Sequence, residues 1–230
     1  MAISVIIPTL NEETVLAQTL AHTAALGFGS IIVVDGGSTD QTVPLAKACC
    51  ARMTTVHVIT APGGRARQMN EGAKASTGET LLFLHADTQL PDDAGRIIES
   101  ALVDPTVKGG RFDVRFSSRS AWGTTIGMFM NWRSRLSRIS TGDQAIFVRR
   151  HVFEQLGGFS DIPLMEDIDF SKRLKRAGRI AALRETVTTS FRRWEQQGPL
   201  RTILLMWTLR FLYWLGVSPH RLNRFYETIR

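Results

Sequence analysis

Short apolar runs alternate with helical patterns in the first half of the chain, and this alternation restricts the fold more than any other feature. The runs cover residues 3–7, 31–34, 56–60 and 80–85. Continuous apolar runs of this kind are typical of strands covered on both faces, as in parallel sheets. Helical patterns follow at residues 14–26, 41–51 and 65–75. The alternation predicts right-handed βαβ units and an α/β protein.

The fourth run carries a carboxylate to its own end, in the segment His85-Ala86-Asp87. Ligands of open α/β sheets bind at the carboxyl ends of the strands, and Asp87 there suits a hard cation that holds a diphosphate. A strand-end Asp also caps a following helix, so this position alone leaves both interpretations open. The first two strands end in a similar way, with polar residues at Thr9, Asn11, Glu12 and Asp35.

A glycine-rich turn with two arginines precedes the third helix, at Gly63, Gly64, Arg65 and Arg67. Such a turn suits an anion, or stacking on a base. The first βα turn lacks G-x-G-x-x-G, and G-x-x-x-x-G-K-[ST] does not occur in the sequence. Dehydrogenases with a Rossmann fingerprint and P-loop ATPases therefore lose their main support.

The second half contains a strand pattern and two polar clusters. Residues 109–116 alternate apolar and charged side chains, which predicts a half-buried strand. Gly142-Asp143-Gln144 precedes another strand, and Glu166 and Asp167 begin a helix. Two acids in a first helical turn also complement the helix dipole, and composition alone favours that simpler role.

Five segments together resemble the family 2 glycosyltransferases of GT-A fold. They are SVIIPTLNEE, VVDGGSTDQT, GRARQMNEGAKASTGETLLFLHADT, GDQAIFVRRHVFEQLGGF and MEDIDFSKRLKRAG, in that order and spread over most of residues 3–178. The whole chain more closely resembles a small bacterial branch of family 2-like transferases with a C-terminal RRWE segment and an apolar helix. The resemblance implies a Rossmann-like, mostly parallel central sheet flanked by helices, with C-terminal amphipathic helices.

This resemblance also implies an organisation of the chain. Residues 1–190 are expected to form the GT-A catalytic domain, with a nucleotide-sugar-binding half at 1–105 and an acceptor-binding half at 106–190. Residues 191–230 are expected to form a C-terminal helical extension.

A nucleotide-diphosphate-sugar donor follows from the resemblance, together with the residues that bind it. These are Pro8, Thr9, Asn11, Glu12, Asp35, Arg65, Arg67, Asn70, His85, Ala86, Asp87, Arg193 and Trp194. His85-Ala86-Asp87 occupies the D-x-D position, whose last Asp binds Mn²⁺ or Mg²⁺. The chain departs from the motif by having His85 in place of the first Asp. An imidazole carries no negative charge at neutral pH, so this exchange affects which metal is preferred. A basic interfacial patch is the other interpretation of the arginines before Trp194.

The acceptor side follows from the same resemblance. Asp167 is expected to be the general base that deprotonates the acceptor hydroxyl, with Glu166 as a supporting group. Acceptor binding is expected at Gly142, Asp143, Gln144 and Glu166. An inverting transfer of this kind needs one base and one stabiliser of the leaving group.

The chain is basic, with a net charge of +7 and a pI near 10.1. Many late arginines accompany the apolar stretch 203–217, which is interrupted by Arg210 and is too short to span a bilayer comfortably. This stretch suits an interfacial helix on anionic lipid, or a helix packed on the protein or on a second subunit. We expect membrane-surface contact through residues 200–217 and a lipid-linked or small-molecule acceptor, with a homodimer as the other use of this stretch.

The adjacent Cys49 and Cys50 have no second pair to complete a zinc site or a disulfide framework, which predicts reduced packing residues. The chain begins directly with a strand pattern, without a signal-peptide pattern. These features predict a cytoplasmic protein. Where residues 200–217 contact a membrane, the protein is expected to be peripheral on the inner face of the cytoplasmic membrane.

Two rival classes of function share some of these features. A nucleotidyltransferase of related fold would carry a Gly-rich, basic loop after the first strand, where this chain has Thr9-Leu10-Asn11-Glu12. A basic module that binds membrane or nucleic acid without catalysis would have no use for Asp87 and Asp167 in one cleft. We expect no nucleic-acid partner.

Overall fold

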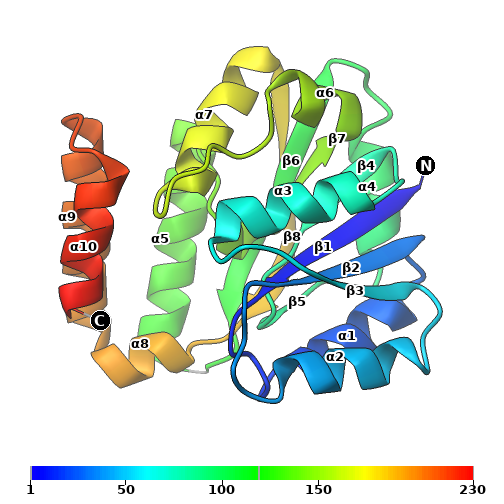
Figure 1. Ribbon diagram of the computed structural model, residues 1–230. Coiled ribbons are helices and arrows are strands. Elements are labelled where there is room, and N and C mark those ends of the chain that lie inside the picture. The colour runs from blue at the N-terminus through cyan, green and yellow to red at the C-terminus, as the bar shows by residue number, and fades with distance from the viewer. Residues whose placement is uncertain (1, 119, 230) are drawn as a thin grey trace.

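The structure, a computed structural model, describes residues 2–118 and 120–229, with side chains except at 193 and 227–229. Within these residues the strands form one 8-stranded sheet in the order β3-β2-β1-β4-β7-β6-β8-β5, with helices on both faces (Figure 1). The strands are β1 Ile3–Thr9, β2 Ser30–Asp35, β3 Val56–Thr60, β4 Thr80–Phe83, β5 Thr88–Gln89, β6 Val107–Phe116, β7 Ile146–Arg149 and β8 Arg179–Thr189. The α-helices are α1 Leu16–Ala25, α2 Thr42–Cys50, α3 Arg65–Ala75, α4 Ala94–Ala101, α5 Ala121–Ser137, α6 Arg150–Gln155, α7 Glu166–Ala177, α8 Arg192–Gln197, α9 Pro199–Trp214 and α10 Pro219–Ile229.

The apolar strands are continuous in sequence because both faces of the sheet are covered. Alternate residues of β1, such as Val5 and Ile6, enter two different cores. Helices α1, α2 and α4 close the core that contains Val5, whereas α3, α6 and α7 close the core that contains Ile6. The α/β fold expected from the alternation is confirmed.

One strand of the second half joins the sheet beside the first half and runs in the opposite direction. Strands β1 to β4 are parallel, but β7 pairs antiparallel with β4, with Ile146 opposite Phe83. The beginning of β7 therefore lies at the carboxyl end of β4. This pairing carries the short 3-10 turn η1, Gly142–Gln144, to the strand ends where the first half is expected to bind its ligand.

Strand β6 is buried on both faces apart from Arg115, so the expectation of a half-buried strand at 109–116 is wrong. Arg111 is 1% exposed and Asp113 is 9% exposed. The guanidinium of Arg111 donates to Asp113, and Arg135 of α5 donates to the other oxygen of Asp113 at 2.6 Å. Arg135 reaches Asp113 from α5, and these paired charges make the burial of Arg111 and Asp113 tolerable.

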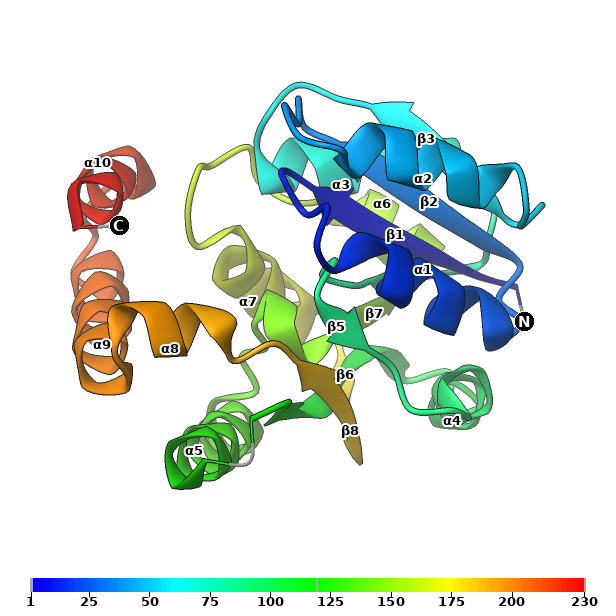
Figure 2. The same ribbon diagram turned by 90° about the horizontal axis from the view of Figure 1, so that it is seen from below.

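The C-terminal helices α8, α9 and α10 extend from the β8 side of the sheet (Figure 2). Helix α8 leads away from β8, and α9 and α10 form a pair at the end of the molecule opposite the N-terminus (Figure 2). Leu205 and Leu209 of α9 pack with Met165 and Ile168 around the start of α7. In the described part of the chain, the length and apolar character needed to cross a membrane are not met by any helix.

Candidate active site

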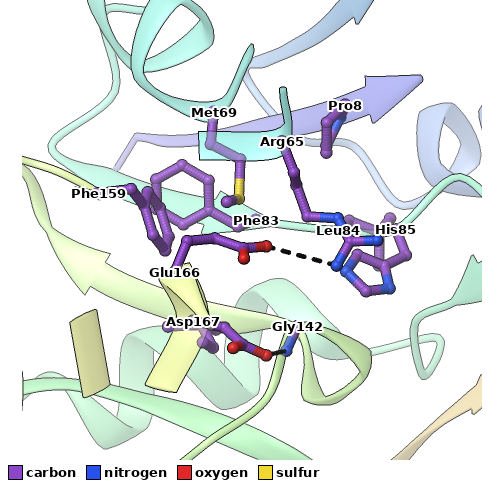
Figure 3. Close-up of a pocket in the computed structure, with 11 residues that line it drawn as sticks. Pro8, Arg65, Met69, Phe83, Leu84, His85, Gly142, Phe159, Glu166 and Asp167 are labelled. Atoms are coloured by element: carbon purple, nitrogen blue, oxygen red, sulfur yellow. Dashed lines mark hydrogen bonds and ion pairs between the residues drawn. The ribbon is translucent and has the colours of Figure 1, made fainter. Parts of the chain in front are cut away.

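A pocket lies at the carboxyl ends of β1 and β4, facing the first turn of α7 (Figure 3). It is lined by Pro8, Arg65, Met69, Phe83, Leu84, His85, Gly142, Ile146, Phe159, Glu166 and Asp167. Pro8, Arg65, His85, Gly142, Glu166 and Asp167 are predicted site residues from both halves of the sequence. The apolar wall of Met69, Phe83 and Phe159 was not predicted, because in sequence these side chains look like ordinary core.

The loops after β1 and β2 are joined by hydrogen bonds into one edge. The backbone N–H of Asn11 donates to Ser38 Oγ at 2.9 Å, and that of Thr39 donates to Asn11 Oδ1 at 2.9 Å. The N–H of Glu12 donates to Thr42 Oγ1 at 2.8 Å. Asn11 adopts a left-handed conformation with φ of 56°, which asparagine tolerates better than most residues. The predicted nucleotide-binding edge is thus held in one arrangement.

Asp35 organises the turn that follows β2. Its carboxylate accepts hydrogen bonds from the N–H groups of Gly37 and Ser38, both at 2.9 Å, and from Ser38 Oγ at 2.5 Å. Thr9 Oγ1 also donates to this carboxylate, at 3.4 Å. The side chain is therefore a structural anchor of the edge, and its contact with a nucleoside stays a prediction.

Arg65 reaches from the first turn of α3 across the pocket. Its Nη1 lies 3.4 Å from Glu166 Oε1, and in Figure 3 the guanidinium lies beside the His85 ring. Burial alone would lower the pKa of Arg65, but the carboxylates around it, at Glu166, Asp167, Asp143 and Asp87, raise this pKa. Arg65 is thus the cation that several site acids share.

His85 connects the end of β4 to the turn η1. Its Nδ1 lies 3.1 Å from Asp143 Oδ1. Gly142 packs on the imidazole so closely that a Cβ at this position would be 2.3 Å from Nε2. Position 142 therefore has to be glycine while the ring stays in place, and His85 has a positioning role that its place in the D-x-D motif did not predict.

Asp167 is held at the start of α7 with its carboxylate directed to the pocket. Its Oδ2 accepts a hydrogen bond from the backbone N–H of Gly142 at 2.9 Å. Its Oδ1 accepts one from the backbone N–H of the next residue, Ile168, at 2.7 Å. Met165, just before the helix, has a φ of 70°, which turns the chain sharply into the site. Glu166 is 4% exposed, and burial raises the pKa of its carboxyl although Arg65 acts against that rise.

Asp87 lies at the end of the nucleotide-binding edge, near Glu12. Its Oδ1 accepts long hydrogen bonds from the hydroxyls of Thr88 and Thr189, at 3.3 and 3.5 Å. Burial and the charge of Asp87 raise the pKa of Glu12, and Arg192, His85 and Arg65 oppose this rise. Two carboxylates thus face one another at this edge. Among the described residues, no cluster of three or more His, Cys, Asp or Glu could enclose a metal ion.

We expect Glu12→Gln to make the protein more stable at neutral pH. The folded-state pKa of Glu12 is raised above the ordinary value of 4.5, so its contribution to stability is present below pH 4.5 and is lost as the pH rises through the folded pKa. Glutamine cannot ionise and avoids this loss. Melting temperatures should be higher for the variant at pH 7 and should converge with those of the unmodified protein near pH 4, whereas the exposed control Glu154→Gln should show neither effect. A lower melting temperature for Glu12→Gln at pH 7 would contradict the prediction.

Arg67 and Asn70, the predicted wall of the nucleotide site, both hold the segment before α7. Asn70 donates to the carbonyl of Phe159 at 2.8 Å and accepts from its N–H at 2.9 Å. Arg67 Nε donates to both carboxylate oxygens of Asp161, at 2.8 and 3.0 Å. Their contact with a nucleotide stays a prediction. Ala86 is buried, and its carbonyl accepts from Thr19 Oγ1 at 2.6 Å.

Gln68 was missed by the sequence analysis, although it ties the first two strand ends together. Its Nε2 donates to the carbonyls of Thr9 and Val34, at 2.7 and 2.8 Å. In the sequence, its place shortly after the Gly-rich turn is the signal for this role, whereas its burial is visible in the structure alone. Gln144 is also fully buried, with its Oε1 accepting from the N–H of Thr141 at 3.2 Å, so it shapes η1, and its predicted contact with an acceptor stays a prediction.

The C-terminal extension reaches the nucleotide-binding edge through α8. Arg192 donates to Thr14 Oγ1 at 2.8 Å, and its Nη2 lies 3.7 Å from Glu12 Oε2. Trp194 packs with Phe116 and Phe191 under the start of α8. The side chain of Arg193 lies outside the described residues, so its predicted contact with the diphosphate stays a prediction.

Known proteins resemble the chain in sequence. The chain is 32% identical over 180 residues to the PGL/p-HBAD biosynthesis glycosyltransferase of Mycobacterium tuberculosis, a match that covers 74% of this chain and 68% of that protein. It is 28% identical over 198 residues to the probable glycosyltransferase YdaM of Bacillus subtilis, covering 76% of this chain. The chain spans about half, 47%, of that relative's length.

Solved structures resemble it in fold. TarS 1-349 of S. aureus in complex with UDP-GlcNAc gives a TM-score of 0.68 at 18% identity, over 83% of this chain and 58% of that chain. The mannosyltransferase PcManGT from Pyrobaculum calidifontis, in complex with GDP-Man and Mn²⁺, gives 0.62 at 20% identity, over 81% of this chain and 56% of that chain. At these identities the likeness establishes the GT-A fold. The family model described as "Glycosyl transferase family 2" matches residues 4–157, more than half of the chain, and the chain therefore belongs to glycosyl transferase family 2.

Proposed function

We propose that this protein transfers a sugar from a nucleotide-diphosphate-sugar donor to an acceptor hydroxyl, with inversion at the anomeric carbon. The observation that supports this most directly is the position of Asp167. Its carboxylate is anchored by the Gly142 N–H in the same pocket as Arg65 and His85, at the strand ends that carry the nucleotide-binding edge. Related structures hold UDP-GlcNAc and GDP-Man on this fold, which supports a nucleotide sugar as donor.

Asp167 acts as the general base in this proposal. A carboxylate accepts the proton as the acceptor hydroxyl becomes more acidic in the transition state. The two N–H groups that bind Asp167 fix its orientation but leave each carboxylate oxygen a further lone pair for the acceptor. Arg65, between the acids and the strand ends, would bind the charge that develops on the leaving diphosphate.

The edge around Asp87 fits a divalent cation. Its carboxylate is a hard oxygen ligand that accepts long hydrogen bonds from two hydroxyls, and Glu12 adds negative charge nearby. A single carboxylate completed by substrate phosphates and water is typical of Mg²⁺ sites, so an enclosed protein cluster is not required. Bound Mn²⁺ or Mg²⁺ would neutralise charge on the departing diphosphate. PcManGT, of the same fold, holds Mn²⁺ with its donor.

A thermal-shift screen of nucleoside diphosphates and nucleotide sugars, with and without Mn²⁺ or Mg²⁺, tests the donor assignment. A ligand at a hundredfold excess over its Kd should stabilise the fold by about 2.7 kcal/mol. The response should require the metal. If no nucleoside diphosphate or nucleotide sugar of the panel shifts the melting temperature with either metal, the transferase proposal fails and a binding module without catalysis gains support.

A second part of the proposal concerns a membrane surface. Large apolar side chains are exposed along one stripe of α9, and a similar stripe runs along α5. We call these two stripes the aromatic face; its members are Trp122, Phe129, Trp132, Leu136, Leu200, Leu204, Trp207, Phe211, Trp214 and Leu215. The two stripes join where the rings of Phe129 and Trp207 lie 5.7 Å apart. A lipid surface suits this face because it is aromatic and α9 also carries the exposed Arg201, next to Leu200.

Exchange of two tryptophans of the aromatic face should therefore weaken binding to lipid vesicles. Trp207 is 57% exposed and Trp214 is 74% exposed. Burial of one such side chain is worth roughly 1.5–3 kcal/mol, so the double variant Trp207→Ser, Trp214→Ser should lower partitioning onto anionic vesicles by about tenfold or more in a flotation assay. Val103→Ser, at an 80% exposed position beyond α4, is the matched control. Equal flotation of all three proteins would refute the lipid surface, and concentration-dependent dimers lost in the double variant would assign the face to a second subunit.

A further inference from the structure

Two arginines, one on α5 and one on α9, lie near one another beside the proposed catalytic base. Arg133 is on α5, one turn after Phe129, and Arg210 is on α9, one turn after Trp207. The Phe129–Trp207 contact joins these helices, which run in the same direction in Figure 1. Side chains one helical turn further along both helices therefore lie next to one another.

These two guanidinium groups lack the partners that buried charges usually have. Arg133 Nη2 is buried and has no hydrogen-bond partner among the described residues. Neither arginine forms an ion pair with a carboxylate in the part of the chain that the structure describes. Burial, and then the charge of Arg210, lower the pKa of Arg133 to about 10, so it remains protonated at neutral pH. Two unpaired, partly buried cations side by side oppose folding unless an anion joins them.

The pair lies on the acceptor side of the pocket. Burial lowers the pKa of both arginines, and Asp167 and Asp143 are close enough to oppose this lowering. Leu209, which is fully buried next to Arg210, packs in one cluster with Met165 and Ile168 on either side of Asp167. Both oxygens of Asp167 already accept backbone hydrogen bonds. The arginines are therefore held near the base by packing, without an ion pair to it.

We infer that Arg133 and Arg210 bind a phosphate group of the acceptor and so place its hydroxyl next to Asp167. Two guanidinium groups suit a phosphate, whose oxygens accept several charge-assisted hydrogen bonds. The inference rests on the proposed transferase function, because only a transferase has an acceptor substrate. The phosphate could belong to a lipid, whose chain would continue onto the aromatic face one turn away, or to a soluble compound.

Binding of simple phosphates to the whole protein tests the inference. The probes are inorganic phosphate, hexyl phosphate, decyl phosphate below its micelle concentration, and decanol as the uncharged analogue, each titrated by calorimetry. The double variant Arg133→Gln, Arg210→Gln should bind the phosphates roughly ten- to a hundredfold more weakly, because it loses two charge-assisted contacts. Arg133→Lys should retain part of the affinity. The exposed Arg176→Gln, in the last turn of α7, should behave as the unmodified protein, and the binding of decanol should be the same in all variants.

Two further measurements separate this role from others. UDP or GDP binding in the presence of Mn²⁺ should be unchanged in the double variant, since the acids that act on the pair are Asp167 and Asp143 of the proposed acceptor side. Without added phosphate, Arg133→Gln should melt at the same temperature as the unmodified protein or higher, because an unpaired buried charge is removed. A lower melting temperature together with weaker binding of every ligand would show a structural role and overturn the inference.

The remaining outcomes are equally distinct. If the unmodified protein binds none of the phosphates, or the double variant binds them as well, the inference is wrong. A loss of nucleotide binding alone would assign the arginines to the donor diphosphate and would also overturn it. If nucleotides fail to bind the unmodified protein while phosphates bind through the arginines, the phosphate site stands and the proposed transferase fails. Affinity that grows from inorganic to decyl phosphate supports the site with a lipid source, and equal affinity supports it with a soluble one.

Discussion

Asp167→Asn should lower sugar transfer by about 10²- to 10⁴-fold, the range typical of a lost general base. Asparagine keeps the shape of the side chain, and its Oδ1 can still accept from Gly142 or Ile168, but it cannot take the proton from the acceptor. Donor binding should survive, because the nucleotide-binding edge lies on the other side of the pocket. Initial rates of transfer, or of donor hydrolysis in the absence of an acceptor, provide the measurement.

Asp169→Asn is the matched control for this variant, because Asp169 is on the same first turn of α7 but faces away from the pocket. Its carboxylate accepts from Ser160 Oγ at 2.7 Å and from Arg173 Nε at 2.9 Å. Glu166→Gln should reduce the rate less than Asp167→Asn, or raise the KM for the acceptor. Turnover near that of the unmodified protein in Asp167→Asn would exclude this residue as the base and direct attention to Asp143 or Glu166.

Asp87→Ala should abolish metal-dependent binding of nucleoside diphosphates while the fold stays intact. The carboxylate is the metal ligand in our proposal, and its hydrogen bonds to Thr88 and Thr189 are long, so the structure loses little with it. The melting temperature with UDP or GDP should no longer respond to Mn²⁺ or Mg²⁺. Unchanged affinity with unchanged metal dependence would show that Asp87 does not bind the metal.

His85→Asp is the companion variant. It restores the usual acid of the D-x-D motif and should preserve or strengthen metal binding. It also removes the ring on which Gly142 packs and the contact with Asp143, so the turn η1 loses a support. Tighter metal binding with slower transfer would separate these two roles of His85. Loss of metal binding would show that the imidazole itself serves the metal.

The sequence predicted the parts of the fold that depend on local pattern. The strand at residues 56–60 and the helix at residues 65–75 have the predicted bounds, and α1 and α2 are a few residues shorter than their patterns. The burial of β6 was not predictable, because alternating charges indicate a solvent-facing side until Arg111 and Arg135 are seen to pair with Asp113.

Candidate residues that a motif marks lie together in the structure, whereas residues that only tertiary contacts bring together were not predicted. Asp167, Glu166, His85 and Arg65 line one pocket as expected. Arg133 and Arg210 are 77 positions apart in the sequence, and nothing near either residue in the sequence indicates that they meet. Their proximity depends on the packing of α9 against α5 and α7, which no local pattern encodes.

The antiparallel pairing of β4 with β7 makes one sheet out of the halves that we propose bind donor and acceptor, and this limits how the protein can be divided. A fragment that ended after residue 105 would retain every predicted residue of the nucleotide-binding edge up to Asp87. It would also leave the fully buried, apolar β4 as an open edge, from which Leu81, Leu82 and Phe83 could pair with another copy. Such a fragment should aggregate. The halves must therefore fold together, and the alignment of donor with acceptor is set by strand register, with no hinge between them in the sheet.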